Sequence, residues 1–171
     1  MKKYELTAEF IEKWGKKLFR IKALISFGSV EAGELGGYIE KEDNLAHDGN
    51  AWVSGNARVS GNARVSGDAE VSGDARVYGD AEVSGNADYL LIGRIGSRFS
   101  FTTFFKNKDK GITVSCGCFL GTIAEFRAKV TDTHGNNKHA KIYNLAADMA
   151  ELQILGEEHF DKLNTNKSES F

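Results

Sequence analysis

Apolar residues between positions 51 and 87 recur every six residues, in words that read Ala-x-Val-x-Gly-Asn or Ala-x-Val-x-Gly-Asp. Ala and Val are two apart in each word, so on a strand they share one face, while the Trp, Arg or Glu between them takes the other. Gly followed by Asn or Asp tolerates left-handed backbone angles and predicts a bend. The pattern therefore predicts a series of very short strands, each followed by a turn. Their apolar positions are Val53, Val59, Val65, Val71, Val77 and Val83, with Ala51, Ala57, Ala63, Ala69, Ala75, Ala81 and Ala87.

Two arrangements can use such strands, and register separates them. In an antiparallel meander with Gly-Asn hairpin turns, Ser54 would pair with Ala57 and Val53 with Arg58, which mixes core and solvent residues on each face. In a coil that always turns the same way, every Ala and Val points inward and successive turns stack in parallel. The coil explains the pattern. An interior filled by Val and Ala is packed solid, so it leaves no room for a ligand.

The word "VSGNAR", with an aliphatic residue first and a small residue fifth, resembles the hexapeptide repeat of left-handed parallel β-helices. The stretches "ELGGYIEKEDNLAHDGNAWV", "KLFRIKAL" and "ITVSCGCFLGTIAEF" resemble segments of uncharacterised bacterial and prophage hexapeptide-repeat proteins. The resemblance covers most of residues 16–150. It implies three words per triangular turn and packing as a homotrimer, and it implies no established reaction.

The expected fold is mainly β: a left-handed parallel β-helix with an N-terminal β cap and a C-terminal αβ module. We expect the cap and the approach to the repeat in residues 1–46, the β-helix in 47–94 and the αβ module in 95–155. Residues 156–171 have the composition of a disordered polar tail.

In the cap, the alternation in "LFRIKALISF" predicts one or two strands, and residues 7–17 predict a short helical turn that Gly15 ends. Leu35, Ile39 and Leu45 are expected to carry the core into the repeat.

In the αβ module, "RFSFTTFFKNKDKGITVSCGCF" predicts a β-hairpin that turns at "NKDKG". One face is expected to hold Phe99, Phe101 and Phe105. The other is expected to hold Ile112, Val114, Cys116 and Cys118.

Two helices are expected after the hairpin. Thr122 and Glu125 have the spacing of a capping box, which predicts a helix that ends at Gly135. A second helix is expected from about Asn137 to Leu155. The apolar positions expected to be buried are Ile123, Phe126 and Val130 in the first helix and Ile142, Leu145, Ala146, Met149 and Leu152 in the second.

If three words make one turn, residues 18 apart stack on the outside of the coil. One column is then Glu40, Arg58, Arg76 and Arg94; a second is Trp52, Glu70 and Asp88; a third is Ala46, Arg64, Glu82 and Ser100. Stacked arginines destabilise each other unless something neutralises them. Either corner aspartates or a neighbouring subunit's carboxylates do so, or Arg58, Arg76 and Arg94 bind a phosphate or nucleotide anion with their forked donors.

His47 takes a place that valine holds in later words. Hexapeptide acyltransferases, which the repeat also resembles, use a catalytic histidine near a subunit seam, so His47 is a candidate for that role. No inserted loop interrupts residues 47–88, so a capping role is favoured and no catalytic residue is assigned. Cys116 and Cys118 with His134 or His139 offer a weak zinc set, and small core residues are favoured instead. Neither a metal nor a cofactor is expected.

The stretch "RFSFTTFFK" mixes aromatic and basic residues as single-strand nucleic-acid platforms do, yet it also fits a core strand, which is favoured. The chain has a net charge of -2, with seven Lys/Arg against three Glu in residues 1–30 and three Arg against seven Asp/Glu in residues 47–88. This charge distribution gives no overall basic surface for nucleic acid.

The two cysteines form no disulfide framework, and the N-terminus shows no apolar run of signal-peptide or membrane-spanning length. These features predict a cytoplasmic protein with no membrane partner.

The sequence thus favours a non-enzymatic oligomeric scaffold or binding protein of phage or prophage type. It would present its αβ modules to a host protein, in a counter-defence or regulatory role. The alternative is a binder of a nucleotide or another small anion at subunit seams, and a third hypothesis is an acyltransferase that uses His47 as its base.

Overall fold

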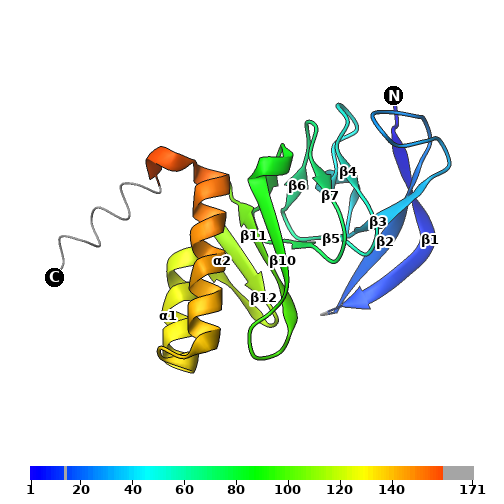
Figure 1. The fold of residues 1–171 in the computed structure, drawn as a ribbon. Helices are drawn as coiled ribbons and strands as arrows, with labels where there is room; N and C mark the ends of the chain where they lie inside the picture. The colour runs from blue at the N-terminus through cyan, green and yellow to red at the C-terminus, as the bar shows by residue number, and fades with distance from the viewer. Residues whose placement is uncertain (14, 160–171) are drawn as a thin grey trace. The chain divides into compact units, whose positions relative to one another are not determined.

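The computed structural model describes residues 1–13 and 15–159, and the predicted tail from residue 160 onward lies outside the described residues. The chain divides into two compact units, Met1–Asp88 and Tyr89–Phe171. The fold is mixed α/β and mostly strands: short parallel strand pairs, an antiparallel four-stranded sheet and two C-terminal helices (Figure 1).

The first unit begins with three antiparallel strands, β1 (Tyr4–Lys13), β2 (Lys16–Ala23) and β3 (Leu35–Ile39). The predicted helical turn is wrong, because residues 7–13 belong to β1 and Gly15 lies in the turn to β2 with φ 74°. Antiparallel pairing with β2 holds these residues in a strand rather than a helix, and it places the centres of the Phe10 and Phe19 rings 6.0 Å apart.

Ile39 and Leu45 are buried as expected, whereas Leu35 is 47% exposed. Leu35 lies at the start of β3 opposite Lys22. Ile21 and Trp52 fill the core beside β3. They lie so close to the backbone of Gly36 that a Cβ added there would be 2.6 Å from Ile21 and 2.7 Å from Trp52.

The repeat segment, residues 47–88, contains six strands of two residues each. Each of its three parallel pairs joins residues 18 apart, such as Val53 with Val71, and this confirms the register expected within the repeat. The strands are β4 (Trp52–Val53), β5 (Arg58–Val59), β6 (Arg64–Val65), β7 (Glu70–Val71), β8 (Arg76–Val77) and β9 (Glu82–Val83), paired as β4 with β7, β5 with β8 and β6 with β9.

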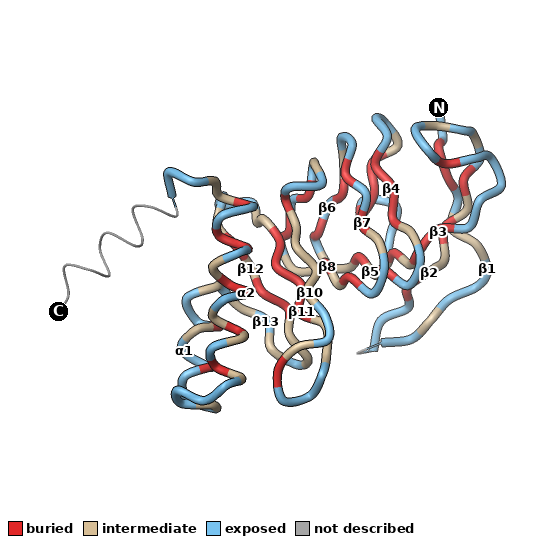
Figure 2. The backbone as a smooth tube through the Cα atoms, viewed as in Figure 1, coloured by how far each residue is buried: buried red, intermediate tan, exposed pale blue. Residues whose placement is uncertain are grey.

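The interior of the repeat segment is filled by alanine and valine, as predicted (Figure 2). The six valines and the alanines from Ala51 to Ala81 are at most 1% exposed. Ala87 was expected inside and is exposed, because the chain leaves the repeat through a 3-10 turn at Asn86–Asp88. The Asp88 carboxylate ends the repeat by accepting hydrogen bonds from the backbone N–H groups of Ser84 and Gly85.

The corners of the repeat carry a second regular interaction. Five consecutive corner glycines, from Gly55 to Gly79, have φ between 62° and 75°, which glycine adopts at low cost. The next residue is Asn on one turn and Asp 18 residues later, and the Asn side chain donates to the Asp side chain. The pairs are Asn50 with Asp68 (3.0 Å), Asn56 with Asp74 (3.5 Å) and Asn62 with Asp80 (3.2 Å).

The first turn of the repeat has no earlier repeat word above it, yet its alanine carbonyls all have donors. In later turns these carbonyls accept from the backbone N–H of the preceding turn, as Ala75 does from Arg58. In the first turn two of the three donors are side chains, so the N-terminal segment satisfies this strand edge. The donors are Lys3 Nζ for Ala51 (2.8 Å), the Tyr38 N–H for Ala57 (2.9 Å) and Asn44 Nδ2 for Ala63 (2.8 Å).

The expected column positions fail before residue 52. Tyr38, not Glu40, lies opposite Arg58, and Leu45 lies opposite Val65, so Ala46 is not the neighbour of Arg64. The segment that leads into the repeat, from Tyr38 to Arg58, spans 20 residues rather than 18, because it includes the 3-10 turn Glu42–Asn44.

The second unit is an antiparallel sheet of β10 (Tyr89–Ile95), β11 (Ser100–Lys106), β12 (Ile112–Cys116) and β13 (Phe119–Thr122), in that order. The predicted hairpin is the β11–β12 pair. Its predicted faces are partly wrong. Phe104 and Phe105 are fully buried, while Phe99 is 72% exposed because it lies in the turn before β11.

The helices α1 (Ile123–His134) and α2 (Lys138–Leu155) follow β13. The capping box is confirmed, since the Thr122 hydroxyl accepts from the Glu125 N–H and the Glu125 side chain accepts from the Thr122 N–H. At α2 the Asn137 side chain is the cap, since its Oδ1 accepts from the N–H groups of His139 and Ala140. The helices cover the sheet with one core, which is centred on Phe104, Val114, Phe126, Val130, Tyr143, Ala147 and Ile154.

The predicted buried face of α2 is wrong at three positions. Leu145, Met149 and Leu152 are exposed, and the helix instead packs its alanines and Tyr143 into the core. Small side chains let the helix lie close to α1 and the sheet, and α2 has apolar residues on two faces, so spacing alone selected the wrong one.

Candidate functional site

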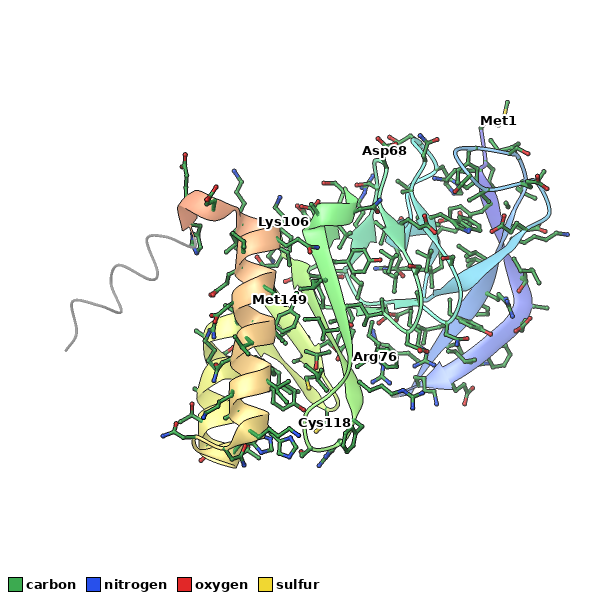
Figure 3. All side chains as sticks on the ribbon, viewed as in Figure 1. Met1, Asp68, Arg76, Lys106, Cys118 and Met149 are labelled. Atoms are coloured by element: carbon green, nitrogen blue, oxygen red, sulfur yellow. The ribbon has the colours of Figure 1, made fainter. Side chains whose placement is uncertain are left out.

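Strand register places four polar side chains in one line across the five-stranded sheet of the first unit. Arg20 on β2 lies opposite Tyr38 on β3, Tyr38 opposite Arg58 on β5, and Arg58 opposite Arg76 on β8. Residues directly opposite each other point to the same face, here the face away from the alanine and valine interior. We call these four residues the outer row; Arg76 is labelled in Figure 3.

One carboxylate lies at the Arg20 end of the outer row. The Glu9 carboxylate accepts hydrogen bonds from Arg20 (3.1 Å) and from the Tyr38 hydroxyl (3.0 Å), and the Arg20 guanidinium lies 5.6 Å from the centre of the Tyr38 ring. These hydrogen bonds, first that of Arg20 and then that of Tyr38, lower the pKa of Glu9. Glu9 therefore neutralises this end of the outer row.

The other end of the outer row places two arginines on adjacent strands. Arg58 and Arg76 are half-buried, and the Nε of Arg58 is buried without a hydrogen-bond partner within the described residues. The Nε of Arg20 is buried in the same way. Glu40, which was expected to stack on Arg58, accepts from Lys16 (2.8 Å) and from the Gly61 N–H (2.7 Å) instead. The hydrogen bond from Lys16 is the main reason that the pKa of Glu40 is lowered.

Arg94, the third predicted arginine of the ligand site, lies in the second unit. It is exposed on β10, which pairs antiparallel with β11, so it does not continue the parallel pairing that joins Arg58 to Arg76. Arg20 and Tyr38 were missed from the sequence, because only the 20-residue spacing between Tyr38 and Arg58 and the β2–β3 register bring them into line with Arg58.

His47 is held by the N-terminal strand. Its ring stacks on Tyr4 with centroids 4.4 Å apart, its Nδ1 accepts from the Lys3 N–H at 3.2 Å, and its Nε2 lies 3.9 Å from a Glu42 oxygen. These contacts join β1 to the start of the repeat segment.

The second unit has a small cavity of about 100 Å³ between the sheet and the helices, lined in part by Cys116, Lys129, His134 and Tyr143. Cys116 Sγ accepts from the Thr102 hydroxyl at 3.2 Å. Burial, and secondarily the neighbouring Cys116, raises the pKa of Tyr143 to about 12.

The two cysteines do not share a face. Cys118 is exposed after Gly117, beyond the end of β12, whereas Cys116 is the last residue of that strand (Figure 3). Among the described residues no three His, Cys, Asp or Glu side chains come together as a metal site would require. The zinc set considered from the sequence therefore has no geometric support.

Arg127 on α1 joins the two helices through a network that the sequence did not indicate. Its guanidinium donates to Asp148 (2.8 Å), to the buried Glu151 (2.7 Å) and to the Asn144 side chain (3.1 Å). A carboxylate as buried as Glu151 needs such a partner, which supports a structural role for Arg127.

An apolar stripe runs along the exposed face of α2. It consists of Ile142, Leu145, Met149 and Leu152, which follow one another at intervals of three, four and three residues. Leu145 is 63%, Met149 57% and Leu152 45% exposed, and Met149 is labelled on α2 in Figure 3. We call these four residues the α2 stripe. A shallow surface cavity that Leu145, Lys141 and Asp148 help to line adjoins it.

No known family model matches the sequence, and no curated protein matches it either. In the described part of the chain, neither helix is long and apolar enough to cross a membrane.

Proposed function

We propose that this protein is a non-enzymatic oligomeric scaffold of the phage or prophage hexapeptide-repeat type. Its repeat segment would be a short left-handed parallel β-helix, and its αβ unit would contact a further copy of the chain through the α2 stripe. In the cell, the oligomer would present these αβ units to a host protein, in a counter-defence or regulatory role.

The β-helix assignment is supported by the parallel pairs. Three successive sides each pair with the side 18 residues later, which is the spacing of three six-residue words per turn. The left hand comes from the resemblance of the words to hexapeptide repeats. Because the interior is filled by alanine and valine, a ligand or partner must bind on the outside or on the second unit.

The observation that carries the scaffold proposal is the α2 stripe. Intervals of three, four and three residues are those of the a and d positions of a heptad, with Ile142 and Met149 at a and Leu145 and Leu152 at d. Monomeric proteins seldom leave adjacent large apolar side chains exposed without a use for them. Because the opposite face of α2 is packed in the core, the helix is already formed before any partner binds.

A second copy of α2 is the occupant that this seam favours. An a/d seam is complementary to itself, and β-branched Ile142 at one of the two a positions, with Leu at both d positions, suits a parallel pair of helices. In a parallel pair the flanking g and e positions would set Lys141 beside Ala146 and Asp148 beside Gln153 of the other copy. No like charges would meet along the seam.

The test is the mass in solution. Light scattering of the wild-type protein should give an oligomer over a broad concentration range. The Leu145→Glu/Met149→Glu variant should have the mass of a monomer by light scattering and the helix content of the wild type by circular dichroism. Leu120→Glu, at a similarly exposed apolar position on β13, is the matched control and should stay oligomeric. A monomeric wild type, or an oligomer that survives both glutamates, would refute self-association through α2.

The parallel orientation of the two α2 helices can be tested separately. In a parallel pair equivalent d positions face each other, so Leu145→Cys in a background with Cys116→Ser and Cys118→Ser should form an intermolecular disulfide under mild oxidation. Failure to cross-link would exclude the parallel arrangement.

The non-enzymatic part of the proposal is supported by the contacts of His47, whose ring and Nδ1 are occupied by Tyr4 and Lys3. Acyl transfer from acetyl-coenzyme A by the purified protein, abolished by His47→Gln, would overturn it.

A further inference from the structure

We infer that the second unit binds a small uncharged molecule with a single aromatic ring, in the cavity between its sheet and its helices. This cavity has a volume of about 100 Å³, and its lining side chains come from β12, β13, α1 and α2. The site does not depend on the α2 stripe, because Tyr143, which lines the cavity from α2, lies in the core of the unit.

The first argument is the chemistry of the cavity walls, which are built mainly from aromatic rings. The centre of the Phe126 ring lies 5.6 Å from that of Phe119 and 5.6 Å from that of Tyr143. The ring planes cross at 55° in the first pair and at 89° in the second, and aromatic rings prefer such inclined contacts. Val130 adds an aliphatic side chain to the same wall. A ring that enters the cavity therefore meets the surroundings that aromatic side chains favour.

The second argument is that the walls are held in place without a ligand. Phe126, Val130 and Tyr143 are at most 6% exposed and belong to the core of the second unit. The Tyr143 hydroxyl packs against the backbone of Gly96, where an added Cβ would overlap it. The His134 ring stacks on the Tyr143 ring with centroids 5.8 Å apart. Walls that are already ordered lower the entropy cost of binding.

The third argument concerns the thiol and the lysine that border the cavity, because both are engaged within the chain. Cys116 Sγ accepts a hydrogen bond from the Thr102 hydroxyl at 3.2 Å. The Lys129 ammonium lies 3.1 Å from the Asp132 carboxylate, and both of these side chains are exposed. A charged ligand would therefore lose its hydration without gaining a free partner at either group, which favours an uncharged ligand.

The size of the cavity limits the ligand to one ring. An apolar protein cavity of about 150 Å³ binds benzene, and this cavity of about 100 Å³ is smaller. A single ring therefore fills it and reaches its mouth. Thr133 is exposed and Phe119 is half-buried, so a small substituent of the ring can remain in water there. Phenol is a simple member of this class of ligand.

The experiment is an NMR titration of the full chain with phenol, in which the methyl signals of valine are followed. We expect the Val130 signals to shift saturably, and those of Val77, which lies in the repeat segment, to stay unchanged. Benzoate carries a charge on the same ring and should bind about tenfold more weakly or worse. Indole has a second fused ring and should also bind more weakly than phenol, because the cavity holds only one.

Two variants test the walls, and a third is their control. Phe119→Leu removes one ring but keeps an apolar side chain, and it should weaken phenol binding by about two- to tenfold, which corresponds to the loss of one aromatic pair. Val130→Phe fills the cavity and should abolish binding, with circular dichroism to confirm the fold. Leu120→Ala, at the exposed neighbouring position on β13, should leave phenol binding unchanged.

Three results would overturn the inference. The first is the absence of a saturable shift of the Val130 signals in the wild-type protein. The second is equal phenol binding by the wild type and Phe119→Leu, and this comparison decides alone if Val130→Phe does not fold. The third is binding of benzoate or indole as tight as that of phenol. The Leu145→Glu/Met149→Glu variant should still bind phenol, so failure of the scaffold proposal and failure of this one are distinguishable.

Discussion

The side chain of Asn44 provides the sharpest test of how the first turn of the repeat is closed. Asn44 is fully buried, and its Nδ2 donates to the carbonyls of Ala63 (2.8 Å) and Gly61 (3.2 Å) while its Oδ1 accepts from the Lys41 N–H (3.0 Å). Asn44→Asp keeps the size and the acceptor oxygen but replaces the donor with a second oxygen. That oxygen would face two carbonyls.

The expected loss follows from these contacts. Each of the two hydrogen bonds contributes about 1 kcal/mol net, and a buried acceptor left without a donor costs about 1–3 kcal/mol. Asn44→Asp should therefore lower the free energy of unfolding by roughly 3–5 kcal/mol at pH 7, a large part of the ~5–15 kcal/mol of a typical domain. Urea denaturation followed by tryptophan fluorescence measures it, because Trp52 is only 2% exposed and lies in the first unit.

The dependence on pH makes the test specific. Burial beside two carbonyls raises the pKa of the introduced carboxyl above its value in the unfolded chain, since only the protonated form can donate. Proton binding then favours the folded state, so the deficit relative to wild type should shrink as the pH falls below that raised pKa. Asn136→Asp, on an exposed loop, should stay within about 0.5 kcal/mol of wild type at pH 7 and at the lower pH. A deficit at Asn44 no larger than at Asn136 would refute the reasoning.

Three further predictions concern single groups. Because the pKa of Tyr143 is raised from about 10 to about 12, its contribution to stability is complete below pH 10 and lost as the pH rises toward 12; Tyr143→Phe should flatten the alkaline part of a stability–pH curve. Thr122→Ala should cost about 1 kcal/mol in urea denaturation, since it removes half of the capping box, and a smaller effect than that of Thr131→Ala would contradict this role. Gly37→Ala would place a Cβ 2.7 Å from the Ala57 carbonyl oxygen and should lower the melting temperature sharply, whereas Gly85→Ala, with open space around it, should not.

The repeat was predictable because the residues of each six-residue word determine its strand and its bend locally. Once Ala and Val share a face, and Gly with Asn or Asp sets each bend, the 18-residue register and the buried valines follow, and the structure agrees. The same logic failed outside the words. The 20-residue segment from Tyr38 to Arg58, which leads into the repeat, places Tyr38 where Glu40 was expected, and nothing local in the sequence specifies the length of that segment.

The helices show why pattern alone was insufficient elsewhere. Their ends were predictable from local chemistry, because Thr122 and Asn137 bond to backbone groups within three residues. The buried face of α2 was not, because apolar residues cover two faces and the choice depends on how close Tyr143 and the alanines can approach the sheet. Of the predicted ligand residues, Arg58 and Arg76 lie together, while Arg94 lies on an antiparallel strand of the other unit.

The alternation of Asn and Asp at the corners constrains how such a chain can grow. A gene duplication that added a single Asp-bearing turn of 18 residues would stack carboxylate on carboxylate at three corners, whereas one that copied an Asn turn together with its Asp turn would preserve every side-chain bond. Lengthening in steps of two turns is thus compatible with these corners, and the residue after each glycine records whether a turn is odd or even.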